Sequence, residues 1–251
     1  MTRTQTFLVL IAAVAFTLSA AAQPKIIAHR GFWKTDGSAQ NSLTSLCKAD
    51  SIGIFGSECD VWMTVDGKLV VNHDRTYQGV EMEKSPAKEI LRVTLPNGEK
   101  IPTFRQYLKE LKRLPDVRLI VEIKSKERPE AARAIAREIL KQKVQERVDV
   151  IAWSVEPTRE AMKLLPGVDF YYLSGNLTPA EVKAAGFQGI DYSDKVLRKH
   201  PEWIKQAQEL GLKVNVWTPS AQKSIEEFIE QGVDFITTDR PDLALRLIDP
   251  R

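Results

Sequence analysis

Short β-prone runs alternate with helical patterns from residue 25 to the end of the chain. Eight runs predict strands, at residues 25–29, 56–61, 118–124, 148–153, 169–174, 189–193, 212–217 and 234–239. Helical patterns follow at residues 42–51, after Pro129, through Met162, from Thr178, around Trp203, at 221–230 and at 241–248. Such alternation predicts parallel βαβ units. Eight units in about 230 residues favour a (β/α)₈ TIM barrel over the alternative, an open doubly wound sheet.

A hairpin signal follows the second predicted strand. The Asp66-Gly67 pair stands between two β-prone runs, which favours a tight turn. A two-residue turn there pairs Val65 with Lys68 and places Asp60 opposite His73, with Cβ atoms about 5 Å apart. Residues 74–102 are then mostly polar and rich in turn residues, and we interpret them as a small insertion at one mouth of the barrel.

The N-terminus differs from the rest of the chain. Residues 7–22 carry no charge, and Ala20 and Ala22 offer an A-x-A cleavage site before Gln23. The apolar run is short for a membrane span, so we predict a cleaved signal peptide at residues 1–22 rather than an anchor. The sequence thus predicts an exported protein, periplasmic or secreted. Residues 23–251 would form a single barrel domain with no stable membrane anchor.

Composition excludes some partners. Of the 251 residues, 43% are hydrophobic and 27% charged, an ordinary globular mixture. The net charge of +3 becomes +2 without the Arg3 of the leader, and no basic block indicates nucleic-acid binding. Cys47 lies on the apolar stripe of the first predicted helix, and Cys59 faces the helix layer. In an oxidising compartment they can form a disulfide, or they remain two buried thiols.

Two of the three histidines end apolar β-runs. His29 and His73 occupy positions that line the active site in a barrel, whereas His200 precedes Pro201 and is predicted to be on the surface. Glu58 and Asp60 are two apart in a strand and therefore share a face.

A third acid has the same character. Glu122 lies among apolar neighbours in the run at residues 118–124, with Lys124 on the same face, so a simple Glu122–Lys124 ion pair is one interpretation. Three buried carboxylates cannot all stay charged without a partner. They favour a hard divalent cation, Mg²⁺ or Ca²⁺; zinc is disfavoured because Cys59 points to the other face.

The stretches IIAHRG, NSL, ECDVWMTVDGKLVVNHD, NGEKIPTF, VEIK, VWTPS and GVDFITTDRPD together resemble the signature of glycerophosphodiester phosphodiesterases, in the expected order. The resemblance spans nearly all of residues 23–251. It implies a (β/α)₈ barrel with a small insertion after the second strand. The implied site comprises a catalytic acid/base pair, His29 and His73; metal ligands, Glu58, Asp60 and Glu122; phosphate-holding residues, Arg30 and Lys124; and Trp217, which packs on the alcohol portion of the substrate.

One motif departs from the family pattern. The chain reads Ala39-Gln40-Asn41-Ser42 where the family commonly has Pro-Glu-Asn-Thr. Gln40 replaces an acid, which puts any charge-dependent role of that position in doubt. Asn41 remains, to cap the first helix or to orient a group at a strand end.

The implied activity is metal-dependent hydrolysis of small-molecule glycerophosphodiesters to glycerol 3-phosphate and an alcohol. Three alternatives remain open. A phosphodiesterase acting on intact lipids would need an apolar rim, which residues 74–102 supply poorly. A non-catalytic phosphodiester- or polyol-binding protein would be expected to lack a histidine or metal acid. A barrel glycosidase would use paired carboxylates on sugars. The oligomeric state is not indicated.

Overall fold

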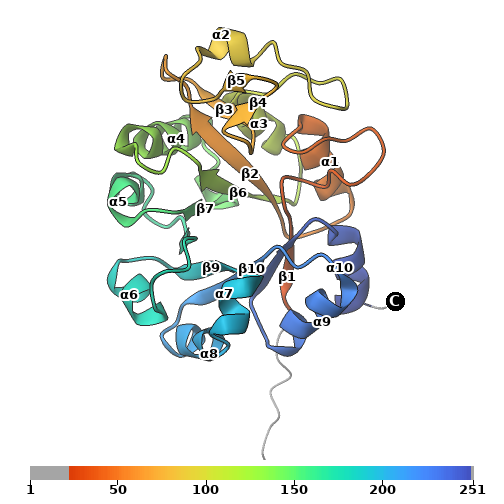
Figure 1. Cartoon of the computed structure of the whole chain (residues 1–251), viewed down its shortest axis with the longest axis vertical. Helices are drawn as coiled ribbons and strands as arrows, with labels where there is room; N and C mark the ends of the chain where they lie inside the picture. The colour runs from red at the N-terminus through yellow and green to blue at the C-terminus, as the bar shows by residue number, and fades with distance from the viewer. Residues whose placement is uncertain (1–22, 250–251) are drawn as a thin grey trace, which may run out of the picture.

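Eight parallel strands close into a barrel in the computed structural model, which describes residues 23–249 (Figure 1). The barrel strands are β1 (Lys25–Ala28), β2 (Gly56–Met63), β6 (Arg118–Ile123), β7 (Val148–Ala152), β8 (Phe170–Tyr172), β9 (Gly189–Ser193), β10 (Lys213–Trp217) and β11 (Phe235–Thr238). Each pairs with the next, and β1 closes the ring by pairing with both β11 and β2. The predicted (β/α)₈ fold and its eight strands are confirmed.

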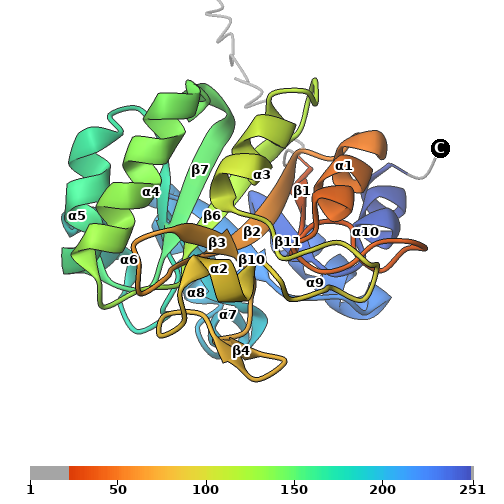
Figure 2. The same ribbon diagram turned by 90° about the horizontal axis from the view of Figure 1, so that it is seen from above.

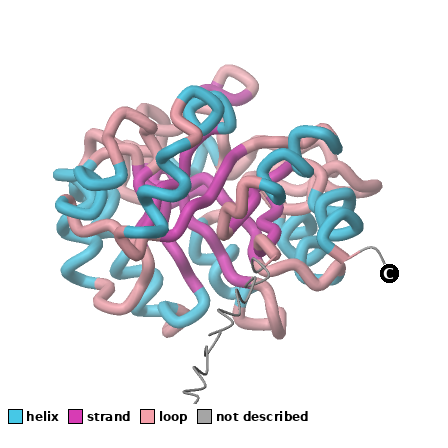
Figure 3. The backbone as a smooth tube through the Cα atoms, turned by 90° about the horizontal axis from the view of Figure 1, so that it is seen from below, coloured by secondary structure: helices cyan, strands magenta, loops and turns pink. Residues whose placement is uncertain are grey.

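The helices form a layer outside the strands (Figure 3). They are α1 (Leu43–Ser51), α3 (Phe104–Leu111), α4 (Pro129–Gln142), α5 (Val155–Leu164), α6 (Pro179–Ala184), α7 (Asp194–Lys199), α8 (Glu202–Glu209), α9 (Gln222–Glu230) and α10 (Pro241–Ile248), with a 3₁₀ turn at Gln145–Arg147. The helix at 104–111 is not among the predicted helices. A capping box formed by Thr103 and Gln106 starts α3, and its apolar stripe is buried against the barrel.

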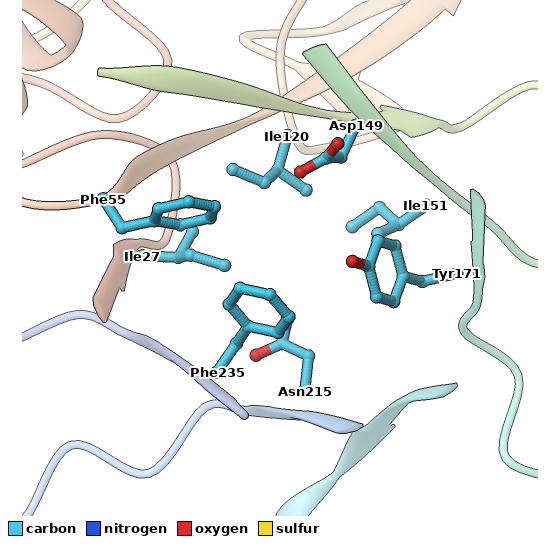
Figure 4. A pocket seen from close by; sticks show the side chains of 8 residues that line it. All are labelled: Ile27, Phe55, Ile120, Asp149, Ile151, Tyr171, Asn215 and Phe235. Atoms are coloured by element: carbon cyan, nitrogen blue, oxygen red, sulfur yellow. The ribbon is translucent and has the colours of Figure 1, made fainter. Parts of the chain in front are cut away.

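An apolar plug fills the middle of the barrel. Its core comprises Ile27, Ile120, Ile151, Tyr171, Leu173 and Phe235. Figure 4 shows most of these side chains, with Phe55, Asp149 and Asn215, converging from around the ring on a space of about 10 Å³. Because side chains alternate along each strand, the plug separates one end of the barrel from the inward residues at the carboxyl ends of the strands.

The predicted hairpin register is wrong by one residue. Strand β3 (Leu69–Val71) runs antiparallel to β2 with Val61 opposite Val71, and Asn72, not His73, donates its N–H to the carbonyl of Asp60 at 3.0 Å. The cause is a longer turn. The N–H of Thr64 bonds to the carbonyl of Lys68, so three residues, not two, lie between the paired positions.

Residues 74–102 form a small subdomain beside β3, seen at the top of Figure 1 and at the bottom of Figure 2. It contains β4 (Thr76–Tyr77), β5 (Val80–Glu81) and α2 (Ala87–Ile90). Its apolar side chains pack into a core of their own with Trp62 and Val70 of the hairpin. The few large apolar residues of this segment are therefore used for its own folding.

No helix among residues 23–249 is long and apolar enough to cross a membrane. The predicted signal peptide at residues 1–22 lies outside the described residues.

Candidate active site

A cavity of about 280 Å³ opens at the carboxyl ends of the barrel strands. It is lined by His29, Arg30, Glu58, His73, Glu122, Lys124, Ile151, Trp153, Leu173, Asp191, Trp217, Thr218 and Thr237. Seven of the eight residues that the sequence singled out are among them. The eighth, Asp60, is fully buried next to Glu58 and Glu122. The barrel thus brings the predicted residues together, while their roles remain predictions.

The three acids form one compact group. Carboxylate oxygens of Glu58, Asp60 and Glu122 lie within 4.8 Å of one another, and all three side chains are buried. Parallel pairing of β2 with β6 sets Asp60 directly beside Glu122. Such a group of oxygens is suited to a hard cation.

Each acid is held by other groups. Glu58 Oε2 accepts the backbone N–H of Arg30 at 2.8 Å, and Glu58 Oε1 has no hydrogen-bond partner. Glu122 Oε1 accepts from Trp153 Nε1 at 2.8 Å and lies 2.8 Å from Lys124 Nζ. Lys124 Nζ also lies 3.3 Å from Asp60 Oδ1. The Glu122–Lys124 ion pair foreseen as an alternative therefore exists within the acid group rather than in place of it.

Burial and the charges of neighbouring groups shift the pKa values of the three acids in different directions. Burial, reinforced by Asp60 and Glu122, raises the pKa of Glu58 well above its ordinary value, and burial likewise raises the pKa of Glu122. Burial also opposes ionisation of Asp60, but Lys124 and the neighbouring histidines outweigh it and lower its pKa. The negative charge is thus concentrated on Asp60, and the pKa of Lys124 is raised by the acids despite its own burial.

The loop between β1 and α1 orients the side chains of Asp60 and Arg30. Asn41 is buried; its Nδ2 donates to Asp60 Oδ2 at 2.7 Å and its Oδ1 accepts the N–H of Asp60 at 3.2 Å. Ser42, not Asn41, caps α1. Of the two roles left open for Asn41, the orienting role is therefore the one observed. Gln40 Oε1 accepts from Arg30 Nη1 at 2.8 Å, so it holds the guanidinium without adding a charge.

Each candidate histidine contacts a carboxylate that the sequence analysis did not single out. His29 Nδ1 lies 2.8 Å from Asp239 Oδ1, and Lys34 Nζ lies 3.1 Å from the second oxygen of that carboxylate. Burial disfavours the ionised form of Asp239, but His29 and Lys34 outweigh it and lower its pKa to about 2. An ionised Asp239 accepts the Nδ1–H of His29, which leaves Nε2 for proton transfer.

His73 sits in a more open setting. Its Nδ1 lies 2.8 Å from Asp74 Oδ1, and burial lowers its pKa despite the opposing effect of Asp60. The signals for both carboxylates were in the sequence: Asp74 directly follows His73, and Asp239 is the final residue of the last predicted strand, where barrel residues reach the site.

The remaining wall of the cavity is aromatic and apolar, with one acid. The rings of Trp153 and Trp217 meet edge to face at 6.3 Å, and Trp217 Nε1 donates to the carbonyl of Asp191 at 3.1 Å. Burial raises the pKa of the Asp191 carboxyl to about 8. Neither Trp153 nor Asp191 was singled out by the sequence analysis, although both lie in predicted strands.

Other predicted features lie away from the cavity. His200 is half-buried at the end of α7 and stacks on Trp203 at 4.2 Å. Cys47 and Cys59 are free thiols: Cys47 Sγ lies 3.6 Å from Glu110 Oε1, and Cys59 is buried under the helices. Gly31 has φ +78° and faces Ser45 of α1, with no room for a Cβ atom.

The fold and the cavity define a barrel hydrolase with carboxylates, histidines and two cationic side chains gathered at one mouth. The chain belongs to the glycerophosphoryl diester phosphodiesterase family, whose model matches residues 29–243. It is an enzyme of that class, and the resemblance in its sequence motifs is confirmed.

Relatives cover nearly the whole chain. A glycerophosphodiester phosphodiesterase from Caldanaerobacter subterraneus subsp. tengcongensis is 26% identical over 239 residues, 89% of this chain and 97% of the relative. A crystal structure of a glycerophosphodiester phosphodiesterase from Parabacteroides distasonis is 45% identical, with a TM-score of 0.87 over 91% of this chain and 98% of that one. An Oleispira antarctica phosphodiesterase, solved with the product sn-glycerol-3-phosphate, shares the fold at 22% identity and a TM-score of 0.78, over 90% of this chain and 97% of that one.

Proposed function

We propose that the enzyme hydrolyses soluble glycerophosphodiesters to sn-glycerol 3-phosphate and an alcohol, using His29 and His73 as an acid/base pair and a divalent cation. The observation that carries the proposal is the shared cavity. Two carboxylate-supported histidines, three clustered acids and the cations Arg30 and Lys124 all meet there. The Oleispira antarctica phosphodiesterase of the same fold was solved with sn-glycerol-3-phosphate as its product, which is the product proposed here.

The acid group fits a cation. Its donor atoms are all carboxylate oxygens, and Glu58 Oε1 is buried with no hydrogen-bond partner. Oxygen ligands of this kind suit Mg²⁺ or Ca²⁺. A cation held by Glu58, Asp60 and Glu122 would offset the negative charge that develops on a phosphate oxygen.

Arg30 and Lys124 supply fixed positive charge for the phosphate. Gln40 holds the Arg30 guanidinium, and the acids hold the Lys124 ammonium, so neither side chain has to be ordered when the substrate binds. One histidine removes a proton from the attacking hydroxyl, and the other protonates the oxygen that leaves phosphorus.

We propose the neighbouring glycerol hydroxyl, rather than water, as the first nucleophile. Its oxygen bonds to phosphorus as the bond to the alcohol oxygen breaks, and the deprotonated and protonated histidines exchange roles when water opens the resulting cyclic phosphate. Two histidines on one cavity support this route, because each step needs one base and one acid. Rapid cleavage of a 2-deoxy glycerophosphodiester would rule it out.

Soluble diesters fit the surface better than intact lipids. The exposed large hydrophobic side chains within residues 23–249 are Val65 at the hairpin tip, Leu140 in α4 and Leu210 at the C-terminal cap of α8. They form no continuous apolar rim of the kind that membrane docking requires.

The decisive assay incubates residues 23–251 with glycerophosphocholine, glycerophosphoethanolamine, glycerophosphoglycerol and glycerophosphoinositol. Release of glycerol 3-phosphate is measured with Ca²⁺, with Mg²⁺ and with a chelator. We expect cation-dependent release that His29→Ala and His73→Ala each abolish, while His200→Ala, which changes a histidine outside the cavity, retains full activity. No release with either cation would refute the proposal.

We further propose that the protein is exported after removal of residues 1–22, on the basis of the apolar run and the A-x-A site. N-terminal sequencing of the protein from its native host should begin at Gln23; an intact Met1 would contradict this.

A further inference from the structure

One acid in the cavity has no part in the proposed chemistry. Asp191 lies in the middle of β9, is 1% exposed and lines the same cavity as the histidines. It is not one of the three acids grouped for a cation, and its neighbours along the cavity wall are Leu173, Trp217 and Thr237.

The Asp191 carboxyl lacks a full set of partners. Its Oδ1 is buried without a hydrogen bond, although the backbone around it is fixed, since its carbonyl accepts from Trp217 Nε1. An unpaired buried oxygen is costly, and a leucine, as at position 173 on the neighbouring strand, would avoid that cost. A ligand group that hydrogen-bonds to Asp191 Oδ1 would remove the cost of leaving this oxygen unpaired.

The cavity has an enclosed end and an open end. Next to His73 and Lys124 it adjoins a hollow that includes Trp62, Arg75 and Lys126. A second hollow at His73 extends to Trp33, Lys34 and Tyr77. The wall formed by Leu173, Asp191 and Trp217 borders neither hollow. The part of a substrate that varies in size therefore fits over His73, and a part of constant size fits against Asp191.

We propose that Asp191 binds the terminal hydroxyl of the substrate's glycerol moiety and thereby selects glycerol-bearing phosphodiesters. The proposal rests on the proposed function and deepens it. The glycerol moiety is common to all such substrates and ends in a hydroxyl, which can donate to the unpaired oxygen. Because burial holds the Asp191 carboxyl largely protonated near neutrality, the other oxygen can also donate. Trp217 then packs on the glycerol carbons, and not on the alcohol portion as the family resemblance implies, while the alcohol lies in the open hollows.

The test compares two substrates and three proteins. Glycerophosphocholine is paired with its 1-deoxy analogue, which keeps the 2-hydroxyl needed for the cyclic route. The wild type is compared with Asp191→Leu and with Asp149→Leu. Asp149 is the control because it is also a buried acid of a barrel strand, but it pairs with Arg118 and lines the space within the apolar plug. Asn215 is unsuitable as a control because its side chain contacts the Asp191 carboxyl.

We expect the wild type to favour glycerophosphocholine over the analogue by about ten- to hundred-fold in kcat/KM. Asp191→Leu should remove this preference, chiefly by raising KM for glycerophosphocholine, and Asp149→Leu should keep it. Equal treatment of both substrates by the wild type, or an equal loss on both in Asp191→Leu, would overturn the proposal.

Two further measurements distinguish a failure of the Asp191 proposal from misfolding of the variant and from failure of the proposed function. If Asp191→Leu does not fold, as judged by its thermal melt, Asp191→Asn replaces it and should retain part of the preference, since an amide still hydrogen-bonds. If the wild type hydrolyses neither substrate, the proposed function fails. Calorimetric binding of sn-glycerol 3-phosphate and of its 1-deoxy form then tests Asp191 on its own: equal affinity for the two would overturn its role.

Discussion

The two histidines obtain their carboxylate partners in different ways. His73 contacts the residue that follows it, Asp74, whereas His29 contacts Asp239, 210 positions away in the chain. The second contact exists because β1 and β11 are neighbours where the barrel closes. Asp239 also accepts from Lys34 and, at 3.4 Å, from Trp33, so three side chains fix it. We therefore regard it as a residue that positions His29.

Asp239→Asn should lower kcat by about ten- to hundred-fold with little change in KM, because an amide no longer fixes the tautomer of His29. Steady-state kinetics on glycerophosphocholine measure the effect. Asp242→Asn is the control, since Asp242 pairs with Arg240 and Arg246 on the following helix. A purely structural role for Asp239 would instead lower the fraction of active enzyme while each remaining site kept its normal kcat.

Asp239 also makes a pH-dependent contribution to stability. Its pKa is lowered to about 2 in the folded protein, against about 3.9 in an unfolded chain. The ionised carboxylate therefore stabilises the fold above pH 4, and this contribution is lost as the pH falls through about 2. Allowing for partial exposure, Asp239→Asn should be about 1–2 kcal/mol less stable than the wild type at pH 4.5. Urea unfolding from pH 4.5 downwards should show the difference shrinking; a constant difference would contradict it.

At the scale of elements, the β1–α1 loop carries unusual backbone geometry next to the site. Arg30, Gly31 and Asn41 all have positive φ. These conformations aim the N–H of Arg30 at Glu58 and the Asn41 amide at Asp60. The backbone conformation of this loop thus fixes the positions of two acids, Glu58 and Asp60.

Gly31→Ala should destabilise the protein by about 3 kcal/mol or more, because a Cβ both strains φ +78° and meets Ser45. Gly37→Ala is a matched control with φ +71° and open space around it, and should cost about 1 kcal/mol. Chemical denaturation measures both. Equal costs would show that the contact with Ser45 does not matter.

At the scale of the whole molecule, the barrel holds Glu58 in its interior at a cost to its own stability. Burial raises the pKa of Glu58, which means that the folded protein disfavours the ionised form. A bound cation would reverse this by favouring the folded state that offers all three ligands. Stability and cation binding are therefore opposed at this position.

Glu58→Gln should melt at the same temperature as the wild type or higher in chelator, and its advantage should grow as the pH rises through the raised pKa of Glu58. With Ca²⁺ or Mg²⁺ at about a hundred times its dissociation constant, the wild type should gain about 2.7 kcal/mol and the order should reverse. Thermal melts with and without cation measure both effects. A wild type whose melting temperature ignores every divalent cation would contradict a metal site here.

The local sequence determined the fold class and the end of the barrel at which the site lies. Strand spacing of two put Glu58 and Asp60 on one face, alternation of strands and helices gave the barrel, and apolar runs ending in His29 and His73 marked the active mouth. These features follow from the periodicity of single elements, which neighbouring residues encode. The helix at 104–111 was missed because it directly follows a polar insertion that interrupts the alternation of strands and helices.

Only the tertiary structure decided the rest. The hairpin register depended on one additional turn residue, which the Asp66-Gly67 pair does not specify. The contact of His29 with Asp239 and the place of Asp191 in the cavity lining depend on barrel closure, which joins strands far apart in sequence. Local patterns fix which face a side chain takes, but its partners across the barrel are set by long-range strand pairing.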